Sequence, residues 1–311
     1  MATREHGYGA VLALENGDIG KPEEAYFSKR RELTRTALSS YSHEWHFLPQ
    51  HIVEIPATKK TASPAEDMVR ISAGEFDFKV SGIEIEGSNR AGLDVQYPWE
   101  NSPHRSHNHH MQVAAFDMDR FPVTNAEFKK FLDDTKYHPI DDHNFLRDWK
   151  NNAPPAGWEN KPVTWVSLED ARAFAKWAGK RLPHEWEWQY AAQGTDGRIY
   201  PWGSDWDDSA VPDPDKTRDL TGPNDVNAHP KGASPFGVMD LVGNIWQWTD
   251  EFTDPHTRTA ILRGGSYYQP QNSIWYFPET YKLTEHGKYL LMAPSKDRAG
   301  TLGFRCVRDV L

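Results

Sequence analysis

The sequence predicts an α+β fold built from short strands, a few helices and much irregular loop. Three observations lead to this prediction. The 311 residues are 38% hydrophobic, which is enough for a sizeable core. The 13 Trp, 12 Tyr and 14 Phe stand beside 22 Gly and 22 Pro, a mixture typical of loop-rich folds that aromatic side chains hold together. Short segments that alternate with period two precede segments with helical spacing.

The first 65 residues differ in pattern from the rest. Residues 8–14 form a short apolar run that predicts a strand, residues 22–38 predict a helix, and residues 57–65 have the composition of a tether. We therefore expect an N-terminal extension over 1–65 and a main domain over 66–311. Because the strand has no evident partner nearby, a further hypothesis is that the extension is the end of a larger upstream protein.

The main domain is expected to begin with strands. Residues 68–71 and 75–80 alternate around Gly74, which predicts a hairpin with one buried face. Residues 112–118 alternate in the same way and predict another strand. Shorter strands are expected near the end of the chain, at 260–263, 266–268 and 303–307.

Three helices follow from capping residues and apolar spacing. Thr124 can cap a helix whose apolar positions begin at Phe128, and Ser167 opens a capping box before a helix that ends at Gly179. Pro183 suits the first turn of a third helix. The stretch 199–240 is dense in Gly, Pro, Asp and Asn and predicts a long ordered loop region.

Charge and cysteine content exclude several classes of function. The formal net charge of −10 argues against nucleic acid or an anionic membrane surface as the principal partner. No apolar run reaches the ~20 residues of a membrane span, and the N-terminus lacks the pattern of a signal peptide. The protein is therefore expected in the cytoplasm if the chain is complete, or exported if it is part of a larger protein. The single cysteine, Cys306, excludes an internal disulfide.

Four sequence islands in order identify a family. They are FPVTN at 121–125, PVTWVS at 162–167 with WAGKRLP at 177–183, GNIWQW at 243–248, and RGGS at 263–266 with GFRC at 303–306. The chain resembles, over residues 68–308, the formylglycine-generating enzyme or sulfatase-modifying factor family, which includes the C-terminal half of ergothioneine-pathway sulfoxide synthases. The resemblance implies a C-type-lectin-like α+β fold with small twisted antiparallel sheets, two main helices and much irregular loop.

Cysteine-based copper chemistry is not expected. The resemblance implies that oxidase members bind copper through two cysteines shortly before the final Gly-Phe-Arg, but residues 287–294 contain none. Thiolates suit Cu(I) because both are soft, so their absence removes the site. Cys306 is expected to be a small buried hydrophobic residue. Formylglycine-generating oxidase activity is therefore not expected.

Histidines offer the alternative of a non-haem metal enzyme. The sulfoxide-synthase branch takes its iron ligands from a separate helical bundle, and this chain has no room for one. His104, His107, His109 and His110 could instead bind Fe or Cu. In an extended segment His107 and His109 share one face and His110 takes the other, so a solvated polar loop is the competing interpretation. The N-terminal His43, His46 and His51 form a second group that could bind such a metal, and the competing interpretation is a docking segment anchored by Trp45 and Phe47.

Calcium is the ion that the resemblance supports best. The family site combines a side-chain oxygen, two backbone carbonyls and a carboxylate, and the matching positions are Asp240, Gly243, Ile245 and Gln247. Hard Ca²⁺ accepts such oxygens, but a neutral amide at Gln247 weakens the site, and a turn closed by hydrogen bonds is the competing interpretation. The acidic residues Asp205, Asp207, Asp208, Asp213 and Asp215 could hold a second ion or form a solvated acidic loop.

A ligand groove is the remaining candidate site. The resemblance places it between the final Gly-Phe-Arg and the loops before it, where Tyr267, Tyr268, Trp275, Tyr276, Tyr281, Arg298 and Thr301 could line it. Aromatic walls with a few polar groups suit a glycan or an extended peptide, although the same side chains could be core. The sequence therefore favours a calcium-stabilised lectin-like binding or scaffolding protein, with the oxygen-dependent metal enzyme as the alternative.

Overall fold

A computed structural model describes residues 19–33, 35, 48–83, 94–217, 221–269 and 279–311. The chain divides into two compact units, Met1–Phe47 and Leu48–Leu311. In the first unit the described helix is α1 (Lys21–Leu33), with acidic residues in its first turn and basic residues in its last. That charge order stabilises the helix dipole. The helix predicted over 22–38 is present up to Leu33, while the strand predicted at 8–14 lies outside the described residues.

The second unit begins before the predicted boundary at residue 66. Strand β1 (His51–Ile52) pairs antiparallel with β6 (Trp246–Thr253). Further along, the backbone N–H of Thr58 donates to the carboxylate of Asp309 at 2.5 Å, and Thr61 forms a β-bridge with Val310. Residues 48–65 therefore belong to the second unit, where strand pairing, a β-bridge and the bond to Asp309 hold them, including the segment whose composition indicates a tether.

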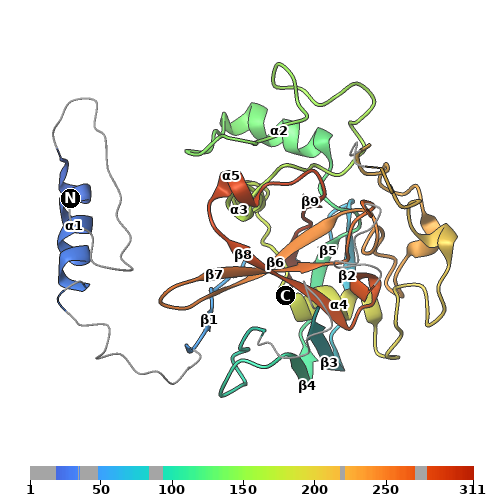
Figure 1. Cartoon of the computed structure of the whole chain (residues 1–311). Coiled ribbons are helices and arrows are strands. Elements are labelled where there is room, and N and C mark those ends of the chain that lie inside the picture. The colour runs from blue at the N-terminus through green and yellow to red at the C-terminus, as the bar shows by residue number, and fades with distance from the viewer. Residues whose placement is uncertain (1–18, 34, 36–47, 84–93, 218–220, 270–278) are drawn as a thin grey trace. The chain divides into compact units, whose positions relative to one another are not determined.

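A seven-stranded sheet forms the centre of the second unit (Figure 1). Its order is β1-β6-β7-β8-β3-β4, and β9 pairs with β6 beside this path. The remaining strands are β7 (Arg258–Arg263), β8 (Glu285–Leu291), β3 (Gly74–Gly82), β4 (Ser106–Val113) and β9 (Leu302–Gly303). The pairs β3–β8 and β6–β9 are parallel, and the β6–β7 pairing shifts register between Trp248 and Glu251.

A separate three-stranded sheet has the order β10-β5-β2, with β10 (Val307–Asp309), β5 (Phe116–Asp119) and β2 (Met68–Ile71). The predicted hairpin of 68–71 with 75–80 is wrong, because β2 and β3 belong to different sheets. The chain crosses between them at Gly74, where a Cβ would collide with the hydroxyl of Tyr190. The strand predicted at 112–118 is likewise divided between β4 and β5.

Helices cover both faces of the β6-β7-β8 layer (Figure 1). On one face, α2 (Asn125–Thr135) and α3 (Leu168–Trp177) form a core with alternate residues of the strands, including Trp246, Trp248 and Leu262. Both helices carry the predicted capping boxes, at Thr124 and Ser167. Alternation places the other strand residues in a second core on the opposite face.

The second core includes α4 (Glu185–Gln193) and β3. Helix α4 is the predicted third helix, but Pro183 precedes its N-cap, His184, instead of lying in its first turn. Strands β6 and β8 were not predicted. Seven of the eight residues of β6 are buried, so its sequence shows no alternation between apolar and polar positions.

The region 199–240 is mostly irregular, as predicted, and contains the short 3₁₀ helices η2 (Asp208–Ala210) and η3 (Pro230–Gly232). The strand predicted at 266–268 reduces to a single bridge between Tyr268 and Asp215. A 3₁₀ turn, η4 (Glu279–Tyr281), and a short helix, α5 (Pro294–Asp297), complete the described elements. The second unit is thus a mixed α+β fold with curled sheets and few helices. None of the described helices has the length and apolarity to span a bilayer.

Candidate ligand-binding pocket

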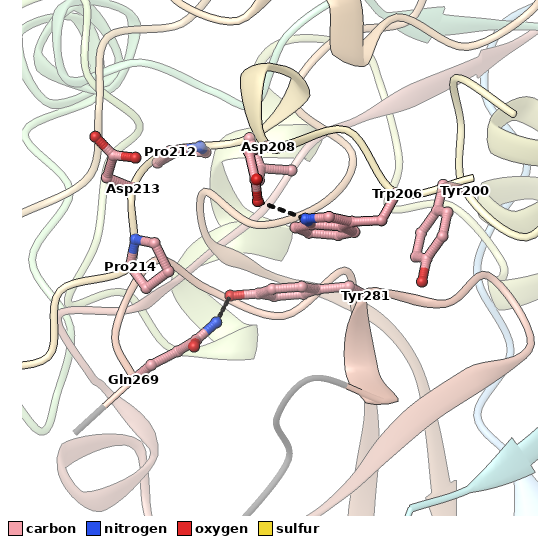
Figure 2. A pocket seen from close by; sticks show the side chains of 9 residues that line it. Tyr200, Trp206, Asp208, Pro212, Asp213, Pro214, Gln269 and Tyr281 are labelled. Atoms are coloured by element: carbon pink, nitrogen blue, oxygen red, sulfur yellow. Dashed lines mark hydrogen bonds between the residues drawn. The ribbon is translucent and has the colours of Figure 1, made fainter. Parts of the chain in front are cut away.

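A pocket of about 350 Å³ opens between the 200–214 loop and the segment around η4 (Figure 2). This volume lies at the lower end of the range for small-molecule sites. The residues that line it are Tyr200, Trp206, Asp208, Val211, Pro212, Asp213, Pro214, Gln269 and Tyr281. Three aromatic rings, two prolines and two carboxylates thus converge from segments that are distant in sequence.

Local turns hold the 200–214 side of the pocket. A short bridge joins Tyr200 and Gly203, and the indole N–H of Trp202 donates to the carbonyl of Asp205 at 2.9 Å. Asp207 then caps η2 by accepting from the backbone N–H of Ser209 at 2.9 Å. These bonds fix the loop at the point from which Trp206 projects.

The opposite wall is Tyr281, a buried residue whose hydroxyl has a fixed role. The hydroxyl donates to the carbonyl of Ser266 at 2.7 Å and accepts from the side-chain amide of Gln269. Burial raises the pKa of Tyr281 to about 12, so the hydroxyl stays protonated near neutral pH. The wall is therefore a neutral ring in one orientation.

The glycines of the RGGS motif make room for this wall. Gly264 and Gly265 both have positive φ, at 90° and 67°, which a residue with a side chain adopts only with strain. A Cβ on Gly265 would lie 2.6 Å from both the hydroxyl oxygen of Thr280 and the ring of Tyr281. The two glycines thus allow both the positive φ and the close approach of the Tyr281 ring.

The three rings pack as an aromatic cluster. Trp206 stacks on Tyr281 with centroids 5.7 Å apart and planes within 8°, while Tyr200 meets Trp206 edge-on at 5.3 Å. Figure 2 shows Trp206 above Tyr281, with Tyr200 to one side and the prolines with Asp213 to the other. Trp206 nevertheless remains 42% exposed, so the cluster is open to a ligand.

Both carboxylates of the pocket are exposed. Asp208 accepts a hydrogen bond from the indole N–H of Trp206 at 2.6 Å, which orients that ring. Asp213 forms neither a hydrogen bond nor an ion pair with any residue that the structure describes. None of the nine lining residues is Lys, Arg or His.

The other acidic residues of this loop serve local turns. Asp207 caps η2, and the two carboxylate oxygens of Asp215 accept from Thr217 and Thr221. These hydrogen bonds lower the pKa of Asp207 and of Asp215. The structure thus divides the predicted acidic set between turn formation and the pocket wall.

The structure disperses the predicted groove residues. Tyr281 lines the pocket, Tyr268 bridges to Asp215 beside it, and Tyr267 is buried with its hydroxyl 3.5 Å from the carbonyl of Gly300. Trp275 and Tyr276 lie outside the described residues. The backbone carbonyl of Thr301 accepts from the N–H of Trp246, the first residue of β6.

Arg298 does not belong to a groove. Its guanidinium is fully buried and bonds the carboxylate of Asp170 in α3, with Nε–Oδ2 at 2.8 Å. It also donates to the backbone carbonyls of Asp141 and His143. Arg298 therefore ties the loop after α2 to α3. Its prediction as a groove residue is corrected, because its partners are residues that are distant in sequence and pack against it in the core.

The predicted calcium positions meet at a turn that hydrogen bonds already close. The amide oxygen of Gln247 accepts from the indole of Trp188 at 3.0 Å and from Arg305 Nε at 2.6 Å. Its amide nitrogen donates to the carbonyls of Asp240 and Leu241. Both lone pairs of the oxygen are in use, so Gln247 does not fit a calcium ligand.

Among the other three predicted calcium positions, only Asp240 carries a carboxylate. Asp240 has a positive φ of 51° and accepts from the backbone N–H of Asn227 at 2.9 Å, while Ile245 is fully buried. Burial raises the pKa of Asp240. Gly243 adopts a φ of 85° in the same turn. The guanidinium of Arg305 donates to the backbone carbonyl of Asp240 at 2.9 Å, so a positive charge already lies beside this turn. Calcium binding here stays a prediction.

The predicted histidine cluster is spread over both faces of β4. His107 is buried, His109 stacks on Trp99 at 4.4 Å, and His110 pairs with the exposed Asp77 at 2.8 Å on the other face. His104 is exposed near Ser102. The predicted alternation of faces is confirmed. Within the described ranges no group of three or more His, Cys, Asp or Glu is arranged to hold a metal ion.

A buried charge network lies beneath β4, and sequence reasoning missed it. His286 of β8 joins the carboxylates of Asp94 and Glu185, the latter at 2.6 Å. His107 contacts the same oxygen of Asp94 at 3.3 Å, and Arg263 reaches Glu185 at 2.7 Å. We call these five side chains the His286 network. Each is less than 5% exposed.

The protonation state of this network follows from its partners. Burial alone would lower the pKa of His286, but the carboxylates of Asp94 and Glu185 raise it to about 10. In the same way the imidazolium holds the pKa of both carboxyls below their usual values despite burial. The charges of His286, Arg263, Asp94 and Glu185 are thus fixed inside the core, where their ion pairs link α4 to β7 and β8.

No local signal in the sequence points to this network. Glu185 follows the N-cap of α4 and is explained by the helix dipole alone, and His286 stands in a strand that shows no clear alternation. Glu187, two residues further along α4, is outside the network and pairs with Arg181 at 2.7 Å. Cys306 is fully buried, and burial raises the pKa of its thiol well above the usual value, as for an unreactive core residue.

Comparisons with known proteins agree with the fold and the motifs. The family model described as the sulfatase-modifying factor enzyme 1-like domain matches residues 54–310. The formylglycine-generating enzyme of Mycobacterium tuberculosis is 29% identical over 302 residues, which cover 72% of this chain and 95% of that protein. The inactive C-alpha-formylglycine-generating enzyme 2 of Bos taurus is 33% identical over 202 residues, covering 50% of this chain and 66% of that protein.

A further relative and two solved structures extend the comparison. The hercynine oxygenase of Mycolicibacterium thermoresistibile is 32% identical over 193 residues, which cover 52% of this chain and 41% of that protein. Among solved structures, PvdO from Pseudomonas aeruginosa has a TM-score of 0.55 at 19% identity and covers 83% of this chain and 100% of its own. CarF has a TM-score of 0.52 at 17% identity, with coverages of 79% and 98%. These two structures share the fold.

Proposed function

Because the chain belongs to the sulfatase-modifying factor enzyme 1-like domain family, we propose that it is a ligand-binding member of this family without cysteine-based oxidation chemistry. The single observation that carries the proposal is the pocket of Tyr200, Trp206 and Tyr281. Aromatic walls with a few polar groups are what a glycan or an extended peptide needs for binding. The protein thereby acts as a C-type-lectin-like binding or scaffolding module.

The cysteine content supports this proposal. Copper chemistry of the kind that the family resemblance implies requires two thiolates, and the sequence has one cysteine. That cysteine, Cys306, is fully buried and bonds through its backbone N–H to the carboxylate of Asp119 at 2.8 Å. The residues at 287–294, where the resemblance places the pair, belong largely to β8. The name of the bovine relative, an inactive formylglycine-generating enzyme, is consistent with a loss of this chemistry within the family.

The form of the pocket also supports ligand binding. Trp206 is held by Asp208 and stacked on Tyr281, while Tyr281 is fixed by Ser266 and Gln269. A wall ordered in advance loses little side-chain entropy when a ligand binds. The two ring faces and the prolines give apolar contact, and the exposed carboxylates give polar contact.

The test is a screen of the purified full chain on glycan and peptide arrays, with and without calcium. We expect a defined set of binders whose signal is lost in Trp206→Leu, because this change removes the exposed wall of the pocket. Ile140→Ala is the matched control, since Ile140 is fully exposed outside the pocket and its truncation should leave binding unchanged. Absence of any binder on both arrays, or equal binding by Trp206→Leu, would overturn the proposal.

A further inference from the structure

We propose that the pocket takes an organic cation, namely the guanidinium or ammonium group of a peptide side chain or of a small molecule. The inference rests on the proposed function and names the class of ligand for the same pocket. It follows from three features of the described side chains: the sign of their charge, the free faces of their rings, and the state of their hydrogen bonds.

Charge is the first feature. The two ionisable acids of the lining, Asp208 and Asp213, are exposed, and no Lys, Arg or His balances them among the nine described lining residues. Asp213 has no hydrogen-bond or ion-pair partner in the described part of the chain. Asp207 and Asp215 in the same region differ from Asp213, because their carboxylate oxygens accept hydrogen bonds within local turns. Within the described residues, Asp213 therefore keeps free acceptors at the pocket edge.

The aromatic rings are the second feature. Cations are attracted to the faces of aromatic rings, and Trp is the best partner. Trp206 is the exposed member of the cluster, and its indole N–H is already satisfied by Asp208 at 2.6 Å. A ligand that approaches Trp206 thus meets ring surface and carboxylate oxygens instead of an unused donor. This arrangement favours a positive group over an anion.

Hydrogen-bond capacity is the third feature. The pocket offers acceptors, on Asp208 and Asp213, while the hydroxyl of Tyr281 and the amide of Gln269 already bond each other. A guanidinium or ammonium group carries donors and no acceptor, so it matches this supply. Pro212 and Pro214 add apolar surface beside Asp213, against which a methylene stem can lie (Figure 2). A neutral sugar would use the rings but would gain less from the charge.

The experiment measures binding of paired probes to the full chain by ligand-observed nuclear magnetic resonance titration. Acetyl-arginine amide is compared with acetyl-citrulline amide, its neutral isostere, and choline is compared with 3,3-dimethylbutanol. We expect each cation to bind at least about fivefold more tightly than its isostere, with an affinity that falls as salt is raised. The two cations distinguish a peptide side chain from a small quaternary amine as the source of the charge.

Variants locate the effect. Asp213→Asn removes the free carboxylate at an exposed position and should weaken cation binding about fivefold while leaving the isosteres unchanged. Trp206→Leu should remove binding of the cations. The matched control is Asp205→Asn, because Asp205 is an exposed acid of the same loop that does not line the pocket. Thermal melting of each variant checks that it is folded.

The outcomes separate this inference from the proposed function. Equal binding of the cations and their isosteres, or no effect of Asp213→Asn, would overturn the organic cation as ligand. If the arrays then still yield neutral binders that depend on Trp206, the proposed function stands. Cation binding that survives Trp206→Leu would place the cation elsewhere and overturn this inference, while array binding by the same variant decides the proposed function separately.

Discussion

His286 lies between two buried carboxylates, and this arrangement leads to two predictions at the scale of the residue. Its two ring nitrogens reach the carboxylates of Asp94 and Glu185, and all three side chains are almost completely buried. Arg263 supplies a second positive charge to Glu185 while its guanidinium lies 4.8 Å from the ring of Trp188. Removal of any one member of such a network is costly, because it leaves the charge of its partner buried in the core without compensation.

Removal of His286 should be strongly destabilising. His286→Ala leaves Asp94 with one imidazole partner and takes from Glu185 one of its two positive partners, so we expect a loss of about 3–5 kcal/mol in unfolding free energy. Urea denaturation measures it. His110→Ala is the control, because His110 pairs with Asp77 at the surface and its loss should cost under about 1 kcal/mol. Equal losses for the two variants would contradict the role of the network.

The same network predicts a pH dependence. The pKa of His286 is raised from 6.5 to about 10 in the folded protein, so its contribution is complete below pH 6.5 and is lost as the pH rises through 10. Asp94 and Glu185 have lowered pKa values, so their contributions are lost as the pH falls below their usual values of 3.8 and 4.5. Denaturation of the wild type and His286→Ala from pH 5 to 10 should show a stability difference that shrinks with rising pH. A constant difference would show that His286 does not titrate with a raised pKa.

At the scale of the element, the RGGS turn and η4 together set the position of Tyr281. Positive φ at Gly264 and Gly265 lets the chain leave β7 sharply, and η4 brings the tyrosine ring against Gly265. The ring then has its hydroxyl fixed by Ser266. The pocket wall thus depends on the absence of a Cβ.

Gly265→Ala tests this dependence. The new Cβ would meet Thr280 and Tyr281 at 2.6 Å, so we expect a loss of about 2–4 kcal/mol together with weaker ligand binding. Gly157→Ala is the matched control: Gly157 has a φ of 80° but nothing lies within 4 Å of the added Cβ. That variant should lose only about 1 kcal/mol, from backbone strain. Chemical denaturation of both variants compares them, and equal costs would mean that contact with Tyr281 is unimportant.

The turn at 240–247 yields a second prediction at this scale. Gln247→Ala removes an amide that makes four hydrogen bonds and leaves Trp188, Arg305 and two carbonyls without it, so we expect a loss of about 2–4 kcal/mol. If hydrogen bonds alone close the turn, a chelator should shift the melting temperature of the wild type by less than about 2 °C. A larger fall that added calcium reverses would instead establish the calcium site that the family resemblance implies.

Capped amphipathic helices could be predicted from sequence because their signals are local. The capping boxes at Thr124 and Ser167 begin α2 and α3 as predicted. Strand pairing was harder, since the 68–71 and 75–80 segments alternate correctly but join different sheets. Alternation fixes the faces of a strand and does not name its partner.

The candidate site shows the same division. Tyr281 and the acids Asp208 and Asp213 were foreseen as groove or loop residues, whereas Trp206, Tyr200 and the prolines were not. Arg298 was misplaced because its partner, Asp170, lies 128 positions earlier in the sequence. The His286 network joins positions 94 to 286 through space, so no spacing rule could find it.

At the scale of the whole molecule, different regions of the second unit provide stability and the pocket. Two aromatic cores on opposite faces of the central sheet give stability, and the His286 network links α4 to the sheet beneath β4. The irregular 199–240 region contributes most of the pocket. Binding residues on loops over a rigid sheet are a common arrangement in proteins.

The most direct test of the central claim is a crystal structure of the full chain with the best ligand from the arrays or titrations. The account predicts ligand density against the exposed face of Trp206, with polar groups of the ligand within hydrogen-bond distance of Asp208 or Asp213. Density at any other place, such as the surface of β8 where the family resemblance puts the copper cysteines, would contradict the assignment of the pocket as the functional site.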